Sequence, residues 1–385
     1  MQTYRELVRA PGFLSLFLSS AVHVAATTMA GLALGVLVFD TTGSPLLAAL
    51  SMFGPSLVQV VGAATVLSAA DRLPPRATLV GLAVAVGLST AAQAVPALPG
   101  WAVFALLLAQ GFVASVGGGV RYGLLRELLP EAGYLLGRST LAMSTGLVQI
   151  LGFAAGGLLV SVLTARGTLL VAAGLFMVAA LIARCCLDER PPRTCGRPSI
   201  AATRSANAQL WSSPARRSTL LGTWVPNGLV VGCESLFVPY APAHAGVLLA
   251  AAALGMLVGD AVVGRFVPPR WRAALPAPLL VLLAAPYLLF ALDLPLPVAA
   301  TAAAVASAGF GSTLLLLDRL MLQTPIELSG QALGLQTAGM LTMQGVGAAL
   351  AGTIAQFTTP ATAIEAMAGA SLAVTAVLAT QWRVH

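Results

Sequence analysis

Long apolar runs separated by short polar breaks extend along almost the whole chain. A helix needs about 20 mostly apolar residues to cross the hydrocarbon core of a bilayer, and the sequence holds twelve runs of this kind. They cover residues 12–39, 44–70, 77–95, 100–123, 134–164, 168–187, 218–241, 245–264, 273–292, 296–317, 329–357 and 361–382. The runs lack the polar–apolar alternation of membrane β-strands. The pattern therefore predicts an all-α membrane protein with twelve transmembrane helices.

Turn-forming residues mark several breaks between these runs. Gly, Pro, Ser and Thr gather at 41–45, 74–75, 96–100 and 294–295, and such clusters end helices. The first run is too long for the core of a signal peptide and lacks a convincing cleavage site, so we expect it to be a retained first span.

The positions of the basic residues predict the orientation in the membrane. Arginines gather before the first run and in the breaks that follow even-numbered runs, whereas the opposite breaks hold only Arg166. Because cytoplasmic loops carry the excess of Lys and Arg, we expect a cell-membrane protein with both termini in the cytoplasm.

Composition and charge narrow the class of protein. Hydrophobic residues make up 58% of the 385 residues, charged residues make up 9%, and the mean hydropathy is +0.91. A soluble domain carries about 25% charged residues, so a water-soluble globule and a disordered or nucleic-acid-binding chain are excluded. The net charge of +7 is explained by the cytoplasmic arginines, so no nucleic-acid partner is expected.

The complete absence of lysine excludes two kinds of chemistry. All 20 basic residues are Arg, whereas a P-loop needs a lysine to contact phosphate and a Schiff base needs a lysine amine. A built-in ATPase therefore does not power this protein.

Cysteine and histidine offer little further chemistry. Cys185, Cys186 and Cys195 lie close together in the sequence, Cys233 lies in the seventh run, and the chain has three histidines. Their spacing fits neither a zinc site nor a disulfide framework. We predict no metal, no cofactor and no catalytic site.

A polar segment at about 188–217 divides the runs into two sets of six. Residues 73–76 (Leu-Pro-Pro-Arg) recur 194 positions later at 267–270 (Val-Pro-Pro-Arg). A shift of 195 relates four residues around the fifth run to four around the eleventh: Pro130, Gln149, Gly152 and Gly157 to Pro325, Gln344, Gly347 and Gly352. Agreement on nearly one shift indicates duplication. The predicted organisation is two pseudo-symmetric six-helix bundles, 1–187 and 218–385, joined by a cytoplasmic linker loop at 188–217.

The loops after the second and eighth runs carry related charged residues. Asp71, Arg72 and Arg76 lie in the first loop, and Arg265 and Arg270 in its repeat. With twelve spans and a long loop after the sixth, the chain resembles the major facilitator superfamily, whose members have a Gly/Asp/Arg motif at these loops. The resemblance implies a gating cluster. Its charged residues would make a contact in only one of the two conformations between which the two halves of a transporter rock. An ordinary topology-setting loop is the alternative.

The fifth run contains a glycine cluster. Gly152, Gly156 and Gly157 resemble the exporter-type Gly-Pro-x-x-Gly-Gly motif of the family, with Phe153 in place of proline. Glycine at this spacing lets helices approach closely, and generic small-residue packing is the alternative. Residues 39–45 also resemble the first outer loop of macrolide-efflux members. The resemblance implies a drug- or macrolide-efflux-type exporter.

Glu234 is the strongest candidate for a functional charge inside the membrane. An ionisable side chain at bilayer depth costs about 2.5–3.5 kcal/mol, and Glu234 lies deep in the seventh run. Pro226 and Gly228 precede it and can interrupt the helix beside a cavity. In the resembled fold the first and seventh spans line the central cavity, so we expect Glu234 to exchange protons or bind a cationic group. A structural Glu hydrogen-bonded to a neighbouring helix is the alternative.

Four further polar residues lie within the runs. His23 in the first run faces either the same cavity or packed neighbours. Arg121 in the fourth run pairs with a carboxylate such as Glu234, binds an anionic substrate, or extends to the headgroups. Gln149 and Gln344, equivalent by the repeat, are candidates for uncharged hydrogen-bonding residues in the lining.

These features predict a secondary active transporter. We expect a monomer in the lipid bilayer that exports a small amphipathic or lipophilic molecule in exchange for protons by alternating access. An uncoupled facilitator or importer of the same fold and a membrane-embedded enzyme are the alternatives.

Overall fold

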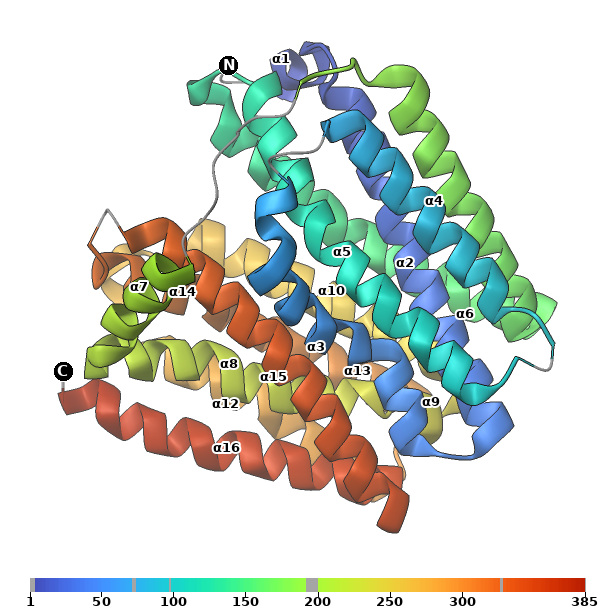
Figure 1. Ribbon diagram of the computed structural model, residues 1–385. Helices are drawn as coiled ribbons and strands as arrows, with labels where there is room; N and C mark the ends of the chain where they lie inside the picture. The colour runs from blue at the N-terminus through green and yellow to red at the C-terminus, as the bar shows by residue number, and fades with distance from the viewer. Residues whose placement is uncertain (1–3, 71–73, 97, 192–199, 326–327, 385) are drawn as a thin grey trace. The chain divides into compact units, whose positions relative to one another are not determined.

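The predicted apolar runs form helices. The computed structural model describes residues 4–70, 74–96, 98–191, 200–325 and 328–384, and this part of the chain contains helices and no strand (Figure 1). By length and composition, eight of its helices can cross a membrane, and two shorter apolar helices cover Pro45–Gln59 and Pro276–Leu292. The all-α membrane fold is confirmed.

The first six runs correspond to five long helices. The N-terminal part consists of α1 (Tyr4–Arg9), α2 (Phe13–Thr42), α3 (Pro45–Ala70), α4 (Pro75–Gln93), α5 (Gly100–Leu128) and α6 (Glu131–Cys186). The long helix α6 contains both the fifth and sixth runs.

A sharp kink at Thr164 divides α6 between its two runs. Thr164 has φ 74° and ψ 164°, far from helical values. Its Oγ1 accepts a hydrogen bond from the backbone N–H of Gly167 at 3.4 Å, as an N-cap residue does at a helix start. The chain therefore turns between the two spans without a loop.

The C-terminal half has shorter elements. It consists of α7 (Ile200–Ser212), α8 (Pro214–Ser235), α9 (Phe237–Tyr240), η1 (Pro242–His244), α10 (Ala245–Phe266), α11 (Pro269–Arg272), α12 (Pro276–Ala284), η2 (Ala285–Leu292), α13 (Leu296–Ala308), η3 (Gly309–Gly311), α14 (Ser312–Leu322), α15 (Ser329–Phe357) and α16 (Pro360–Val384). The ninth run changes from α-helix to 3₁₀-helix at Ala285, one residue before Pro286, which has no N–H to continue the α-helical pattern.

The chain forms two compact units. Unit 1 comprises Met1–Leu37 and Val58–Arg197, and unit 2 comprises Val38–Leu57 and Pro198–His385. The end of α2 and the first half of α3 thus belong to the same unit as α8 to α16. The division of the chain at 187 and 218 by sequence places these residues in the N-terminal bundle.

The first half of α3 packs against α15 within unit 2. A Cβ atom on Gly352 would lie 2.7 Å from the Cα of Leu46, and one on Gly345 would meet the side chain of Leu57. Ser44 Oγ donates a hydrogen bond to Oε1 of Gln356 at 2.7 Å. Small residues on α15 therefore let α3 approach it closely.

Unit 1 has an apolar core at the N-terminal end of α2. Leu7, Phe13 and Leu16 are almost completely buried, and they pack with Leu124 and Leu125 of α5. The short helix α1 thus covers the ends of neighbouring helices with apolar side chains.

The glycines predicted to pack helices lie between α6 and α2. A Cβ atom on Gly152 would lie 2.9 Å from Cβ of Thr28, and one on Gly156 would lie 3.3 Å from the backbone of Met29. Gly157, the third member of the motif, is half-buried. Glycine at the first two positions lets the two helices approach closely.

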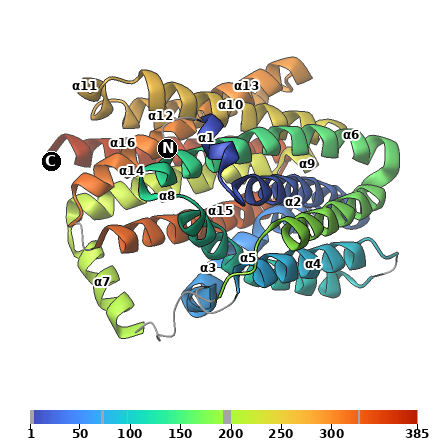
Figure 2. The ribbon, with the colours of Figure 1, turned by 90° about the horizontal axis from the view of Figure 1, so that it is seen from above.

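In unit 2, α8 lies beside α15 and α16 (Figure 1, Figure 2). At the crossing of α8 and α15, Gly228 faces Gly347, and a Cβ atom on either glycine would overlap the backbone of the other helix. The predicted interruption at Pro226 and Gly228 is wrong, because α8 continues to Ser235. The carbonyl of Pro226 accepts a hydrogen bond from Ser371 Oγ at 3.4 Å, and Gly228 serves helix packing.

The segment predicted as a linker loop contains α7, which belongs to unit 2 and packs against α8 within it. Trp211 stacks on Trp224 with ring centroids 5.7 Å apart, and Leu210 is fully buried. Arg216 donates hydrogen bonds to the carbonyls of Gln209 at 2.8 Å and Gln323 at 3.2 Å. These contacts hold the end of the linker against the unit that follows it.

We expect Gly347→Ala to destabilise the protein. The added methyl group would overlap the carbonyl of Gly228, and overpacking of this kind costs about 1–3 kcal/mol of unfolding free energy. The measurement is thermal unfolding of the purified protein. Gly334→Ala on the same helix is the control, because a Cβ atom there meets nothing within 4 Å. Equal melting temperatures for the two variants would contradict this packing.

Candidate functional site

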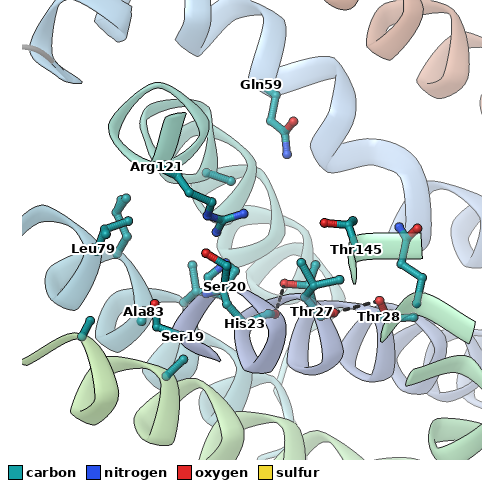
Figure 3. A pocket seen from close by; sticks show the side chains of 18 residues that line it. Ser19, Ser20, His23, Thr27, Thr28, Gln59, Leu79, Ala83, Arg121 and Thr145 are labelled. Carbon is teal, nitrogen blue, oxygen red and sulfur yellow. Dashed lines mark hydrogen bonds between the residues drawn. The ribbon is translucent and has the colours of Figure 1, made fainter. Parts of the chain in front are cut away.

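A cavity of about 330 Å³ lies inside unit 1 (Figure 3). Residues of α2, α4, α5 and both parts of α6 line it, together with Gln59 of α3. Pockets for small molecules have volumes of about 300–1,000 Å³. The cavity therefore has the size of a small-molecule site.

One face of α2 gives the cavity its polar side. Ser19, Ser20, His23, Thr27 and Thr28 all line it, and residues three or four positions apart lie on one face of a helix. Thr27 Oγ1 donates to the carbonyl of His23 at 2.9 Å, and Thr28 Oγ1 donates to that of Val24 at 2.8 Å. Because these hydroxyl protons are used within the helix, the two threonines present acceptor lone pairs to the cavity.

Much of the remaining lining is apolar. It includes Leu79, Leu82 and Val86 of α4 with small residues of α5 and of the second part of α6, among them Ala114 and Ala179. The cavity therefore offers both hydrogen bonds and hydrocarbon contact.

Arg121 of α5 is the cationic group of the cavity. Its side chain lies among Gln59, Thr145 and Ser20 (Figure 3). The Nε of Arg121 is shielded from solvent and has no hydrogen-bond partner among the described residues, and the same is true of Ser20 Oγ. No aspartate or glutamate is found among the described residues that line the cavity.

His23 lines the cavity beside an aromatic ring. Its imidazole meets the ring of Phe176 edge to face, with centroids 5.0 Å apart. His23, Arg121 and Gln149, three of the residues selected from the sequence, thus line one cavity. Sequence reasoning missed Ser19, Ser20, Gln59 and Thr145, although the helical spacing of hydroxyl residues in the first run was a usable signal for the serines.

Glu234 lies in the interior of unit 2 at the end of α8. Its Oε1 accepts hydrogen bonds from Ser307 Oγ of α13 at 3.0 Å and from the Tyr287 hydroxyl of η2 at 3.3 Å. The residue is only 7% exposed. The rings of Phe237 and Phe290 pack beside Tyr287, with centroids 6.2 Å and 5.5 Å from it. The carboxyl group therefore has two hydroxyl donors in an apolar, aromatic setting.

The repeat partner of Gln149 has a different environment. Gln344 of α15 donates from Nε2 to Oδ1 of Asn227 on α8 at 3.3 Å. It thus links two helices of unit 2, whereas Gln149 lines the cavity of unit 1.

Three of the predicted gating residues, Arg76, Arg265 and Arg270, lie at helix ends. Asp71 and Arg72 fall outside the described residues. Arg76 is half-buried in the first turn of α4, and Arg265 and Arg270 are exposed. Nearby, Arg272 pairs with Asp318 at 3.5 Å. The gating role of this cluster stays a prediction.

Metal ligands do not gather within the described part of the chain. No group of three His, Cys, Asp or Glu side chains there could hold a metal ion.

The helical membrane architecture and the cavity are typical of a polytopic transporter, and comparison with known proteins identifies the family. A profile of the Major Facilitator Superfamily matches residues 16–351. The chain belongs to this superfamily, and the protein is a multi-pass membrane transporter. No curated protein matches the chain.

Solved transporter structures share the fold at low sequence identity. A mutant of the nucleoside transporter NupG aligns with a TM-score of 0.77 and 14% identity over 96% of this chain and 99% of its own. A bacterial homologue of the human lysosomal transporter Spinster, inward-facing and unoccupied, gives 0.74 and 14% over 99% and 97%. The human organic anion transporter MFSD10 gives 0.64 and 18% over 98% and 100%. At these identities the likeness concerns the fold.

We expect cysteines placed in the cavity to react with a small water-soluble thiol reagent. In a cysteine-free background, Gln149→Cys should be labelled because the residue lines the cavity. Ser307→Cys should stay unlabelled because that position is fully buried. Labelling is measured by mass spectrometry of the purified protein. Protection of the cysteine at 149 together with labelling at 307 would show that the accessible site lies elsewhere.

Proposed function

We propose that the protein is a secondary active transporter that exports a small amphipathic molecule across the cytoplasmic membrane in exchange for protons. In this proposal both termini lie in the cytoplasm, the protein acts as a monomer, and the two bundles rock to give alternating access. The drug- or macrolide-efflux subtype rests on the glycine motif of the fifth run and on residues 39–45.

The observation that carries the proton coupling is the environment of Glu234. Its two hydrogen-bond donors are neutral hydroxyl groups, from Ser307 and Tyr287, and aromatic rings pack beside the tyrosine. A charged carboxylate is costly in such a place unless a cation balances it. Uptake of a proton removes that cost, and release requires access to water. Glu234 is therefore suited to carry a proton in one state and release it in another.

The cavity of unit 1 supports an amphipathic substrate. Hydroxyl and amide groups of α2 and α6 line part of it, and Leu79, Leu82 and Val86 line another part. A molecule with a polar group and a hydrocarbon body fits this division, because each part then meets matching chemistry.

An uncoupled facilitator or an importer of the same fold is the second candidate. Proton coupling separates the facilitator from the proposed exporter, because a facilitator carries its substrate without using a proton gradient. Both mechanisms are compatible with the proposed gating cluster, which consists of Asp71, Arg72 and Arg76 with Arg265 and Arg270 in the repeat.

We expect Glu234→Gln to abolish transport driven by a pH gradient. The measurement is uptake into inside-out vesicles of a fluorescent dye that the wild-type protein carries, found by screening amphipathic dyes of negative, zero and positive charge. Gln keeps the size and hydrogen bonds of Glu but cannot carry a proton, so gradient-driven uptake should fall to background. Exchange of labelled for unlabelled dye without a gradient should persist.

The matched control is Glu365→Gln, because Glu365 of α16 is also within a membrane helix but is exposed. It should retain both activities. Gradient-driven uptake that survives in Glu234→Gln would remove Glu234 from the coupling, and wild-type transport indifferent to the gradient would favour the facilitator.

A further inference from the structure

We propose that Arg121 makes the cavity of unit 1 a binding site for an anionic oxygen group, so that the transported molecule is an amphipathic organic anion such as a carboxylate. This inference rests on the proposed function for its statement that the cavity holds the transported molecule. The anion site itself is argued from the cavity alone.

The charge of the cavity is the first argument. Among the described residues that line it, Arg121 and His23 are the two with basic side chains, and no carboxylate is found there. A cationic ligand would meet repulsion there, whereas an anion would balance the guanidinium. The described lining therefore selects for negative charge.

The unmet hydrogen bonding of Arg121 is the second argument. Arginine keeps its charge in proteins and has five N–H donors, yet its shielded Nε has no acceptor in the described part of the chain. A shielded N–H donor left without an acceptor is costly. Such a group is retained where function needs it, and a bound anion would satisfy it.

The arrangement of the other polar groups is the third argument. Ser20 and Gln59 line the same cavity as Arg121 (Figure 3), and Ser20 Oγ has no partner among the described residues. Amide N–H and hydroxyl groups donate to the same oxygens that a guanidinium binds. Carboxylate and guanidinium pair through two parallel hydrogen bonds, so Arg121 would hold the anionic group while its neighbours complete the contacts.

The apolar lining of the cavity indicates the chemistry of the rest of the ligand. Leu79, Leu82 and Val86 face the space beside the polar groups. A hydrocarbon or aromatic body next to the anionic group would bury its apolar surface against them. A molecule of the shape of benzoate combines both features.

The test is binding to the purified full-length protein, measured as a saturable rise in melting temperature. The probes are benzoate, benzamide and benzylammonium, which differ chiefly in charge. We expect benzoate to stabilise the wild-type protein and the other two probes to have no effect. Arg121→Gln should weaken benzoate binding about tenfold or more, because hydrogen bonds to a charged group are lost.

Arg126→Gln is the matched control, because Arg126 lies on the same helix but is exposed and does not line the cavity. Its affinity for benzoate should equal that of the wild-type protein. Equal binding of benzoate by Arg121→Gln, preference of the wild-type protein for benzylammonium, or lack of benzoate binding by the wild-type protein would each overturn the proposal.

The ligand-free variant provides a second measurement. If Arg121 is held for a ligand, Arg121→Gln should melt at the same temperature as the wild-type protein or higher, because a shielded donor without an acceptor has been removed. A melting temperature lower by several degrees would mean that Arg121 has a structural partner, and this would contradict an open anion site.

An anionic lipid headgroup offers the same chemistry as a soluble anion. Benzoate binding is therefore repeated in phosphatidylcholine nanodiscs with and without phosphatidylglycerol. Unchanged affinity supports a soluble substrate, whereas strong competition by phosphatidylglycerol overturns that assignment in favour of a lipid.

These measurements are made without a pH gradient, so they are independent of proton coupling. Glu234→Gln should bind benzoate like the wild-type protein. If Glu234→Gln loses gradient-driven transport but the wild-type protein binds no anion, this inference alone is contradicted. If the wild-type protein binds anions but its transport does not use a proton gradient, the proton-antiport mechanism alone is contradicted.

Discussion

The hydrocarbon core of a membrane offers no water to pair with polar groups, and this constraint governs the structure of the protein. Every backbone donor and acceptor has to be satisfied within helices, and every polar side chain has to find a partner inside the protein or a cavity. The two units meet this requirement differently. In unit 2 the carboxyl group of Glu234 receives hydrogen bonds from Ser307 and Tyr287. In unit 1 the Nε of Arg121 has no partner among the described residues. The first arrangement suits a proton carrier, and the second suits a ligand site.

Close approach of helices is the second feature on which these sites depend. Lipid does not drive helices together as water does, so association depends on packing and on small residues. Gly228 and Gly347 bring α8 against α15, and Gly152 and Gly156 bring α6 against α2. These crossings fix the helices that carry Glu234 in one unit and the polar face of α2 in the other. A larger side chain at a crossing would therefore displace a whole helix and with it the site residues that the helix carries.

The two proposed sites divide the transport chemistry between the units. We propose proton exchange at the carboxyl group of Glu234 in unit 2 and substrate recognition in the mixed polar and apolar cavity of unit 1. In these proposals anion binding depends on Arg121 and the use of a proton gradient depends on Glu234. Because the two proposed functions depend on different residues, we expect that they can be lost separately by substitution.

The sequence alone determined the helical spans, because crossing a bilayer imposes a minimum length of apolar chain that hydropathy reveals. It also marked His23, Arg121 and Glu234, since charge at bilayer depth is rare. Only the tertiary structure decided what these groups face. The partners of Glu234 lie 53 and 73 positions away, and Gly228 packs a helix instead of breaking it because α15 lies against it. Such contacts depend on how helices distant in the sequence pack together, and the local pattern of residues along one helix does not predict this packing.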